Sequence, residues 1–233
     1  MIDIPQIKAL LFMKGYSERI PKKNIKPLCN QPLLHWILDT LTQCRYIDEI
    51  VLNTDDPEIA RRATDRFNVT IHMRPEYLLN ITSNEASQIM AYDLKLTEGE
   101  HFLQTHSTNP LLKSDTVDRA VESYFENLDK HDSLFSVTPP QKRFFWENGH
   151  AINHDPQNLI KTQELPFVYE ENSCIYIFSR KVFEEVGNRI GRCPMMFPMD
   201  PYESVDIDEP FDFSIAEALM VERLKSEGNR GAQ

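Results

Sequence analysis

Short apolar runs alternate with helical periodicities along most of the chain. Residues 7–13 (IKALLFM) are continuously apolar and of the length that predicts a buried strand. Further strands of the same kind are predicted at 49–54, 69–72, 101–105, 133–137 and 173–178.

Apolar residues with the period of a helix lie between these strands. One helix face follows the i, i+3, i+4, i+7 spacing, with Leu34, Ile37, Leu38 and Leu41. Asp56 and Pro57 have the residue types of a helix cap and first helical position. Other helices are predicted within 83–96, from about residue 114, and after Pro210. In the last helix the predicted inward residues are Ile215, Ala216, Leu219 and Met220.

Strands that alternate with single helices indicate an α/β fold with a mainly parallel sheet and helices on both faces. Ligands of such sheets bind at the carboxyl ends of the strands. No internal repeat or linker divides the chain, so residues 1–233 are predicted to form a single domain. The pattern breaks at about 139–170, a polar segment with four prolines, and a loop of this length is usually functional, interfacial or disordered. The tail, 226–233, is expected to fray.

Charge and composition exclude several classes of protein. The net charge of −11 argues against a nucleic-acid partner, which needs a positive surface. No apolar stretch approaches the roughly 18–20 residues that span a bilayer. The first residues lack the pattern of a signal peptide, so we expect a cytoplasmic protein. The four cysteines lie far apart without metal-ligand spacing, and they are expected to be reduced.

The segment that leaves the first strand has the residue types of a phosphate-binding loop. Gly15 permits unusual backbone angles, Ser17 offers a hydroxyl, and lysines such as Lys14 and Lys23 supply positive charge. The spacing is neither that of a P-loop nor that of a dinucleotide fold. On charge alone, the favoured interpretation of the segment is a solvated basic face.

Two carboxylates near the other end of the chain suggest a metal site. Asp206 and Asp208 are two residues apart, so in an extended chain both side chains point to one face. Mg²⁺ typically takes one or two carboxylates together with substrate oxygens. The alternative is an acidic helix N-terminus, in which Asp208 and Glu209 favour the helix dipole.

Several blocks in order along the chain resemble the acylneuraminate cytidylyltransferase family, which includes CMP-sialic acid and CMP-Kdo synthetases. The resemblance covers nearly the whole length. Its blocks are residues 19–28 (RIPKKNIKPL), 32–34, 53–60 (NTDDPEIA), 74–75, 103–104 with 109–111, 162–166, 171–172 and 203–208.

This resemblance implies a Rossmann-like sheet, CTP as donor, Mg²⁺ as cofactor and a homodimer whose 139–170 excursion reaches the partner's site. By position, the residues implied to bind the nucleotide are Lys14, Gly15, Ser17, Lys23, Asn24 and Gln104. Asp206 and Asp208 are implied to bind the metal and, with Lys14 and Lys23, to be catalytic. Gln104, Lys161 and Gln163 are implied to face the sugar. The implied reaction joins CMP to the anomeric hydroxyl of a 3-deoxy-2-keto sugar acid, with release of pyrophosphate.

The chain departs from the family pattern close to this site. Lys14 replaces an arginine and so lacks its bidentate fork. Tyr16 replaces a small residue, and Glu18 places an anion where a cation is usual. Asn172–Ser173 replaces Asn–Gly, and 105–110 replaces Pro-Thr-Ser-Pro. These changes favour an altered sugar acid, because the lysine, amide and aspartate residues of the pattern are kept.

Three other interpretations stay open from the sequence. The chain could be a nucleotidyltransferase with another nucleotide or acceptor, or a non-catalytic homologue that holds nucleotide without turnover. A glycosyltransferase with a similar sheet and aspartate pair ranks low, because it would lack the RIPKKN loop.

Overall fold

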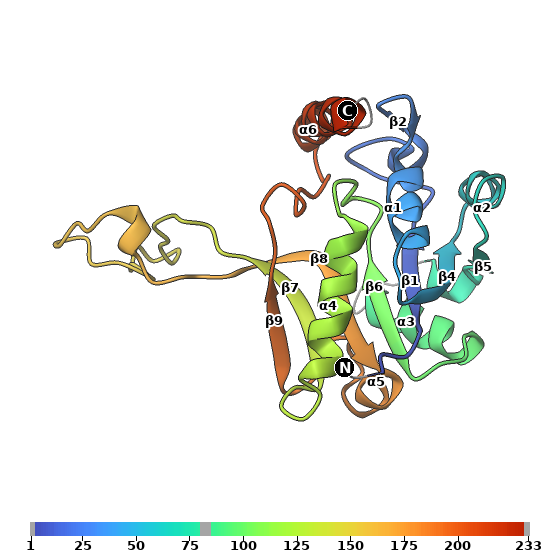
Figure 1. The fold of residues 1–233 in the computed structure, drawn as a ribbon, viewed down its shortest axis with the longest axis horizontal. Coiled ribbons are helices and arrows are strands. Elements are labelled where there is room, and N and C mark those ends of the chain that lie inside the picture. Colours follow the sequence, from blue (N-terminus) through green and yellow to red (C-terminus); the bar gives the residue numbers. More distant parts are fainter. Residues whose placement is uncertain (1–2, 80–84, 231–233) are drawn as a thin grey trace.

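A seven-stranded sheet forms the centre of the computed structural model, which describes residues 3–79 and 85–230. The strand order is β5-β4-β1-β6-β8-β7-β9 (Figure 1). The strands are β1 (Ile7–Met13), β4 (Ile47–Thr54), β5 (Thr70–Met73), β6 (His101–Thr105), β7 (Ser133–Thr138), β8 (Glu170–Ser179) and β9 (Pro194–Pro198). A separate two-stranded ribbon joins β2 (Pro27–Leu28) to β3 (Gln31–Pro32).

Neighbouring strands run parallel except where β8 is inserted. β5, β4, β1 and β6 are parallel to one another, and β9 is parallel to β7. β8 is antiparallel to both β6 and β7. The prediction of a mainly parallel Rossmann-like sheet is therefore confirmed, and β8 reverses because it follows β7 as the second arm of a long hairpin.

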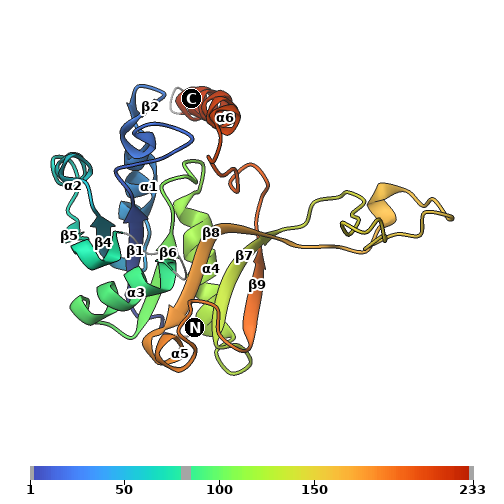
Figure 2. The ribbon, with the colours of Figure 1, turned by 180° about the vertical axis from the view of Figure 1, so that it is seen from behind.

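Helices cover both faces of the sheet, as predicted (Figures 1 and 2). The helices are α1 (Leu33–Thr42), α2 (Pro57–Thr64), α3 (Glu85–Leu96), α4 (Ser114–Glu126), α5 (Arg180–Val186) and α6 (Pro210–Arg230), with 3₁₀ turns at Lys23–Ile25, Glu76–Leu78 and Thr162–Glu164. The apolar residues of α1, α2 and α4 pack in one core cluster with Leu11 and Ile177 of the sheet. Those of α3 and α5 pack on the other face, against Leu10 and Phe102.

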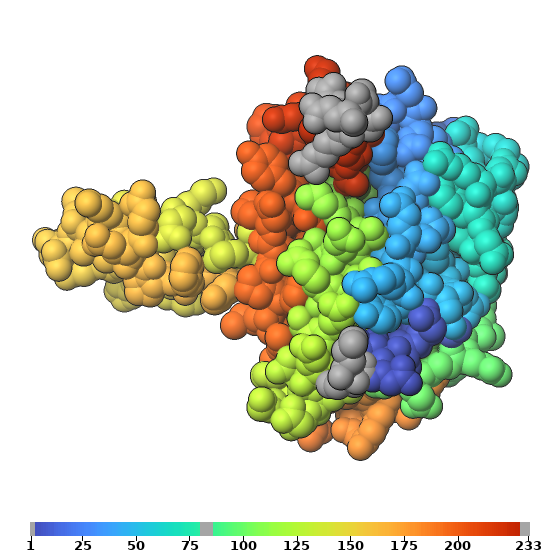
Figure 3. All heavy atoms as spheres, in the orientation of Figure 1, coloured from blue at the N-terminus to red at the C-terminus, as the bar shows by residue number. Residues whose placement is uncertain are grey.

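Residues 139–169 leave the body between β7 and β8 as an extended arm (Figures 1 and 3). The arm holds one 3₁₀ turn and two isolated β-bridges. Its exposed apolar side chains are Phe145, Trp146, Ile152, Leu159, Phe167 and Tyr169. Such a segment has little core of its own, so its order depends on local hydrogen bonds such as those from Asn153 to the carbonyls of Lys142 and Pro166.

The structure corrects the predictions for the last third of the chain. α6 continues through 226–230, where fraying was expected, and residues 231–233 lie outside the described part. Ala216 and Met220 are buried as predicted, but Ile215 is exposed and Phe213 takes the inward place. α5 and β9 were not predicted. The predicted helix start at 83–84 also lies outside the described residues.

No helix in the described ranges combines the length and the hydropathy that crossing a bilayer requires.

Candidate active site

A cleft of about 460 Å³ opens at the carboxyl ends of the parallel strands, within the usual size range of small-molecule sites. The segment after β1, the residues after β6 and part of α3 line it. Its polar and charged lining residues are Lys14, Tyr16, Ser17, Glu18, Arg19, Lys23, Asn24, Arg74, His106, Ser107 and Thr108. The cleft therefore gathers several cations at the edge where ligands of such sheets bind.

Close backbone packing fixes the start of the loop after β1. The Gly15 N–H donates a 2.7 Å hydrogen bond to Oδ1 of Asp55. A Cβ atom on Gly15 would lie 2.6 Å from Cβ of Asp56, so no larger residue fits without a shift. Asp56 itself cannot move freely, because it caps α2 by accepting from the Glu58 N–H at 2.7 Å. Gly15 is therefore needed because there is no room for a side chain, whereas the sequence indicated a role through unusual backbone angles.

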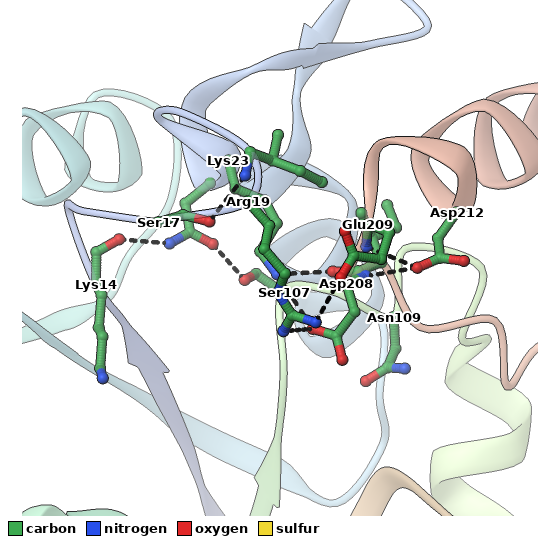
Figure 4. A network of polar contacts seen from close by, with 12 residues as sticks. Lys14, Ser17, Arg19, Lys23, Ser107, Asn109, Asp208, Glu209 and Asp212 are labelled. Carbon is green, nitrogen blue, oxygen red and sulfur yellow. Dashed lines mark hydrogen bonds and ion pairs between the residues drawn. The ribbon is translucent and has the colours of Figure 1, made fainter. Parts of the chain in front are cut away.

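Asn24 ties the two loops of the cleft together (Figure 4). Its Nδ2 donates to the Lys14 carbonyl at 2.8 Å, and its Oδ1 accepts from the Ser107 hydroxyl at 2.6 Å. Asn24 is buried. Its amide therefore shapes the loop that carries Lys14 and Ser17, and both of those residues line the cleft.

Lys23 connects this loop to the aspartate segment before α6. Its Nζ donates to the Ile207 carbonyl at 2.6 Å and lies 3.7 Å from Oδ1 of Asp208. Arg19 pairs with Asp208 and with Glu209, each at 3.0 Å (Figure 4). The first turn of α6 fixes the same segment, because Asp212 accepts from the N–H groups of residues 208 and 209.

The two aspartates have different environments. Asp208 is exposed, whereas burial raises the pKa of Asp206 above its usual value, against a hydrogen bond from Thr108 that lowers it. Among the described residues, Oδ1 of Asp206 is buried without a hydrogen-bond partner. A buried carboxylate oxygen of this kind is stabilised by a cation, so the pair fits a divalent metal.

A metal here would need oxygens from a bound substrate as well. Within 3–79 and 85–230, no three His, Cys, Asp or Glu side chains form a metal-binding group. Mg²⁺ commonly binds in this manner, through one or two carboxylates, water and phosphate oxygens.

Gln104 lies beneath the cleft and does not line it. It is completely buried on β6, and its Nε2 lies 3.0 Å from Nε2 of His106, which does line the cleft. Burial, together with the charges of Arg189 and Lys23, lowers the pKa of His106 to about 3. His106 is therefore neutral near pH 7, and its ring separates Gln104 from the cleft.

Lys161 and Gln163 are not brought to this cleft within one chain. Both are exposed on the arm that projects from the body (Figure 3). Any contact with a sugar would have to be made on another copy.

The departures from the family pattern have distinct structural outcomes. Tyr16 is 75% exposed at the rim, so its ring does not fill the loop. Glu18 lies in the lining of the cleft and lowers its positive charge. Ser173 has a left-handed backbone (φ 57°), the conformation that favours the glycine of the family pattern.

The list of candidate residues from the sequence left out several side chains that the fold brings to the site. Arg74 lines the cleft after β5 and donates to Oδ1 of Asn53 at 2.9 Å. Asp93 of α3 accepts a hydrogen bond from Asn53 and contacts His72, both at 2.8 Å. Asp93 thereby holds Asn53 in place, and Asn53 in turn binds Arg74. The quoted block at 74–75 could have pointed to Arg74, whereas no motif marks Asp93.

Comparison with known proteins places this geometry in context. A sequence profile described as Cytidylyltransferase matches residues 9–228. N-acylneuraminate cytidylyltransferase A of Danio rerio is 29% identical over 219 residues, covering 91% of this chain. The chain spans only half of that relative's length. Post-translational flagellin modification protein B of Campylobacter coli is 24% identical over 231 residues, covering 94% of this chain and 96% of the relative.

A pseudaminic acid cytidylyltransferase of Campylobacter jejuni (serotype O:2) is 25% identical over 219 residues, covering 88% of this chain and 92% of the relative. Among solved structures, a CMP:2-keto-3-deoxy-manno-octonic acid synthetase complexed with CTP superposes with a TM-score of 0.70. It covers 94% of this chain and 99% of its own, at 13% identity, so this likeness concerns the fold.

Proposed function

This chain belongs to the cytidylyltransferase family, and we propose that it transfers CMP from CTP to the anomeric hydroxyl of a 3-deoxy-2-keto sugar acid, with release of pyrophosphate. The observation that carries the proposal is the convergence of the basic loop after β1 with the Asp206–Asp208 segment. The names of the relatives favour an acylneuraminate or a pseudaminic acid as acceptor.

In this proposal the loop cations bind the triphosphate. Lys14, Arg19 and Lys23 line the cleft, and backbone N–H groups of the loop add further donors. The acceptor oxygen attacks the α-phosphorus, the bond between that phosphorus and the oxygen bridging to the β-phosphate breaks, and the hydroxyl proton passes to water. Charge then builds on the departing pyrophosphate, and Lys14 and Lys23 stabilise it.

Asp206 and Asp208 would hold Mg²⁺, which supplies charge neutralisation at the phosphate oxygens and lowers the pKa of a bound hydroxyl. For this, Asp208 has to exchange its ion pair with Arg19 for the metal. Arg19 also lines the cleft in which the triphosphate would bind.

The arm supports a homodimer in this proposal. Its exposed apolar side chains need a covering surface, and Lys161 and Gln163 on it would reach the acceptor side of a partner's cleft. The expected compartment is the cytoplasm.

Pyrophosphate release with CTP and Mg²⁺ tests the function. The panel of acceptors comprises Kdo and sialic, legionaminic and pseudaminic acids with amino-substituted analogues. Asp206→Ala serves as the inactive control, and Asp200→Ala, an exposed aspartate outside the cleft, as the matched surface control. Release with one acid that is lost only in Asp206→Ala supports the proposal.

Binding of CTP without release from any acid would instead support a second candidate, a nucleotide-binding homologue without turnover. Glu18 in the lining of the cleft is the observation that favours it, because an anion there opposes a triphosphate.

A further inference from the structure

Arg189, on the loop between α5 and β9, lies on the sheet beside the cleft. Its guanidinium carbon lies 3.5 Å from the ring centroid of Tyr176, and Nη1 donates a hydrogen bond to Oε1 of Gln104. Gln104 and Tyr176 are cross-strand partners on β6 and β8, and both are completely buried. Arg189 is therefore held by two side chains on the same face of the sheet.

Arg189 has no direct ion pair in the described part of the chain. No carboxylate there lies within 4.0 Å of its nitrogens; Gln104 and the Tyr176 ring are neutral partners. Burial lowers the pKa of Arg189, although arginine stays charged at neutral pH. The charge of Glu171, whose carboxylate accepts a hydrogen bond from the Tyr176 hydroxyl, raises that pKa. The net effect on the pKa is still a lowering, so the distant carboxylate of Glu171 does not fully offset the burial of the guanidinium, and a directly bound anion would offset more of that cost.

Arg189 is one side chain away from the cleft. Gln104 accepts from Arg189 with its oxygen, and its nitrogen lies 3.0 Å from His106, which lines the cleft. Burial lowers the pKa of His106 most, and the charges of Arg189 and Lys23 lower it further. His106 is therefore close to two cations, Lys23 of the loop after β1 and Arg189 of the loop between α5 and β9.

A row of apolar side chains extends from Arg189 across the sheet. Tyr176 pairs in register with Phe135 of β7, and Phe135 pairs with Met196 of β9. Met196 is 47% exposed. Figure 2 shows that no helix covers this face of β7 and β9, whereas α4 covers the opposite face. Met196 and part of Phe135 are therefore the accessible apolar side chains of this row, and Arg189 lies over its buried end at Tyr176.

We infer that Arg189 binds the carboxylate of the acceptor, an inference that rests on the proposed function. In a 2-keto acid the carboxylate is attached to the carbon that bears the attacking hydroxyl. A guanidinium that holds the carboxylate in its planar fork therefore also sets the direction of that hydroxyl. Arg189 contacts Gln104, which contacts His106 in the lining of the cleft, so a carboxylate bound by Arg189 would lie close to the nucleotide site.

Binding of the acid tests the inference without relying on turnover. The probes are N-acetylneuraminic and pseudaminic acids and their C1 carboxamides, titrated calorimetrically into protein saturated with Mg²⁺ and α,β-methylene-CTP, which cannot release pyrophosphate. Arg189→Met keeps the apolar stem over Tyr176 but removes the charge. We expect it to weaken binding of one of the acids by at least about thirtyfold. Arg189→Lys should recover part of that loss.

The carboxamide separates a binding role from a structural one. Wild type should bind it about as weakly as Arg189→Met binds the acid, and combining the two changes should cost little more. Equal preference for acid over carboxamide in wild type and Arg189→Met, or no binding of either acid to wild type, overturns the inference. Pyrophosphate release by wild type is measured separately: acid binding through Arg189 without release contradicts the proposed function alone.

Discussion

Nη2 of Arg19 lies 3.0 Å from Oδ1 of Asp208, so the exposed member of the aspartate pair is already paired with a cation. Both side chains are about half exposed, and such surface pairs contribute only about 0–1 kcal/mol. A divalent metal can therefore displace Arg19 at little cost. The pair keeps Asp208 in place before substrates bind.

Arg19→Gln should tighten binding of a divalent cation to the nucleotide-free protein. Loss of the competing guanidinium is worth up to about 1 kcal/mol, which corresponds to at most about a fivefold lower dissociation constant. Electron paramagnetic resonance of Mn²⁺ measures this directly. Arg61→Gln, which removes two exposed ion pairs of α2, with Glu58 and Asp65, is the control. Weaker Mn²⁺ binding in Arg19→Gln would show that Arg19 holds Asp208 in the binding position.

Lys23→Met should raise the KM for CTP. It removes a largely buried charged donor from the cleft lining, and losses of this kind cost about 2–3 kcal/mol, or about 30–150-fold. Lys22→Met is the matched control, because Lys22 is exposed and outside the cleft. Steady-state kinetics at saturating acceptor separate the two variants, and equal KM values for both would remove Lys23 from the nucleotide site.

His106 should make the protein less stable in acid. Its folded pKa of about 3 lies below the unfolded value of about 6.5, so the unfolded state binds more protons between these values. The free energy of unfolding contributed by His106 is complete above pH 6.5 and falls as the pH drops towards 3. At pH 5 the loss is about 2 kcal/mol. Urea unfolding of His106→Gln between pH 5 and 7.5 should show a smaller decrease of the unfolding free energy with falling pH than wild type. An equal pH dependence in both proteins would contradict the low pKa of His106.

Ser173→Gly should stabilise the protein. Ser173 has φ 57°, and a left-handed conformation costs a non-glycine residue about 1 kcal/mol. The substitution also removes the 3.1 Å hydrogen bond from the Tyr176 hydroxyl to the Ser173 Oγ, which lowers the gain. Ser173→Ala keeps the strain and loses the same bond, so the difference in unfolding free energy between the two variants isolates the backbone effect. A less stable glycine variant would contradict the prediction.

The arm should complete the site of a second copy. Co-expression of Asp206→Ala with Lys161→Ala, each inactive alone, should restore about a quarter of wild-type activity, because half of the random dimers contain one intact site of two. In sedimentation velocity, the double variant Trp146→Ser/Phe167→Ser should contain more monomer than wild type, because it removes two exposed apolar side chains of the arm. Restoration would fail if Lys161 served its own chain, and unchanged sedimentation would place the interface elsewhere.

Local patterns in the sequence were sufficient for most of the fold. The run at 7–13 matches β1, the run at 101–105 matches β6, and the Asp56–Pro57 cap begins α2 as predicted. These features depend on neighbouring residues only, through periodicity, capping and burial of a continuous apolar run. Recognition of ordered blocks likewise identified the family and the basic loop with its aspartate partners.

Tertiary structure alone decided how those residues meet. Asp206 and Asp208 look alike in sequence. In the structure Asp206 has a buried oxygen without a hydrogen-bond partner among the described residues, whereas Asp208 is paired with Arg19. Gln104 was expected in the site but lies beneath His106, and Lys161 lies on an arm that leaves the body. Arg189 belongs to no motif, because its position depends on β8 reversing beside β6. Burial and charge pairing between distant segments are properties of the packed chain, and no local pattern encodes them.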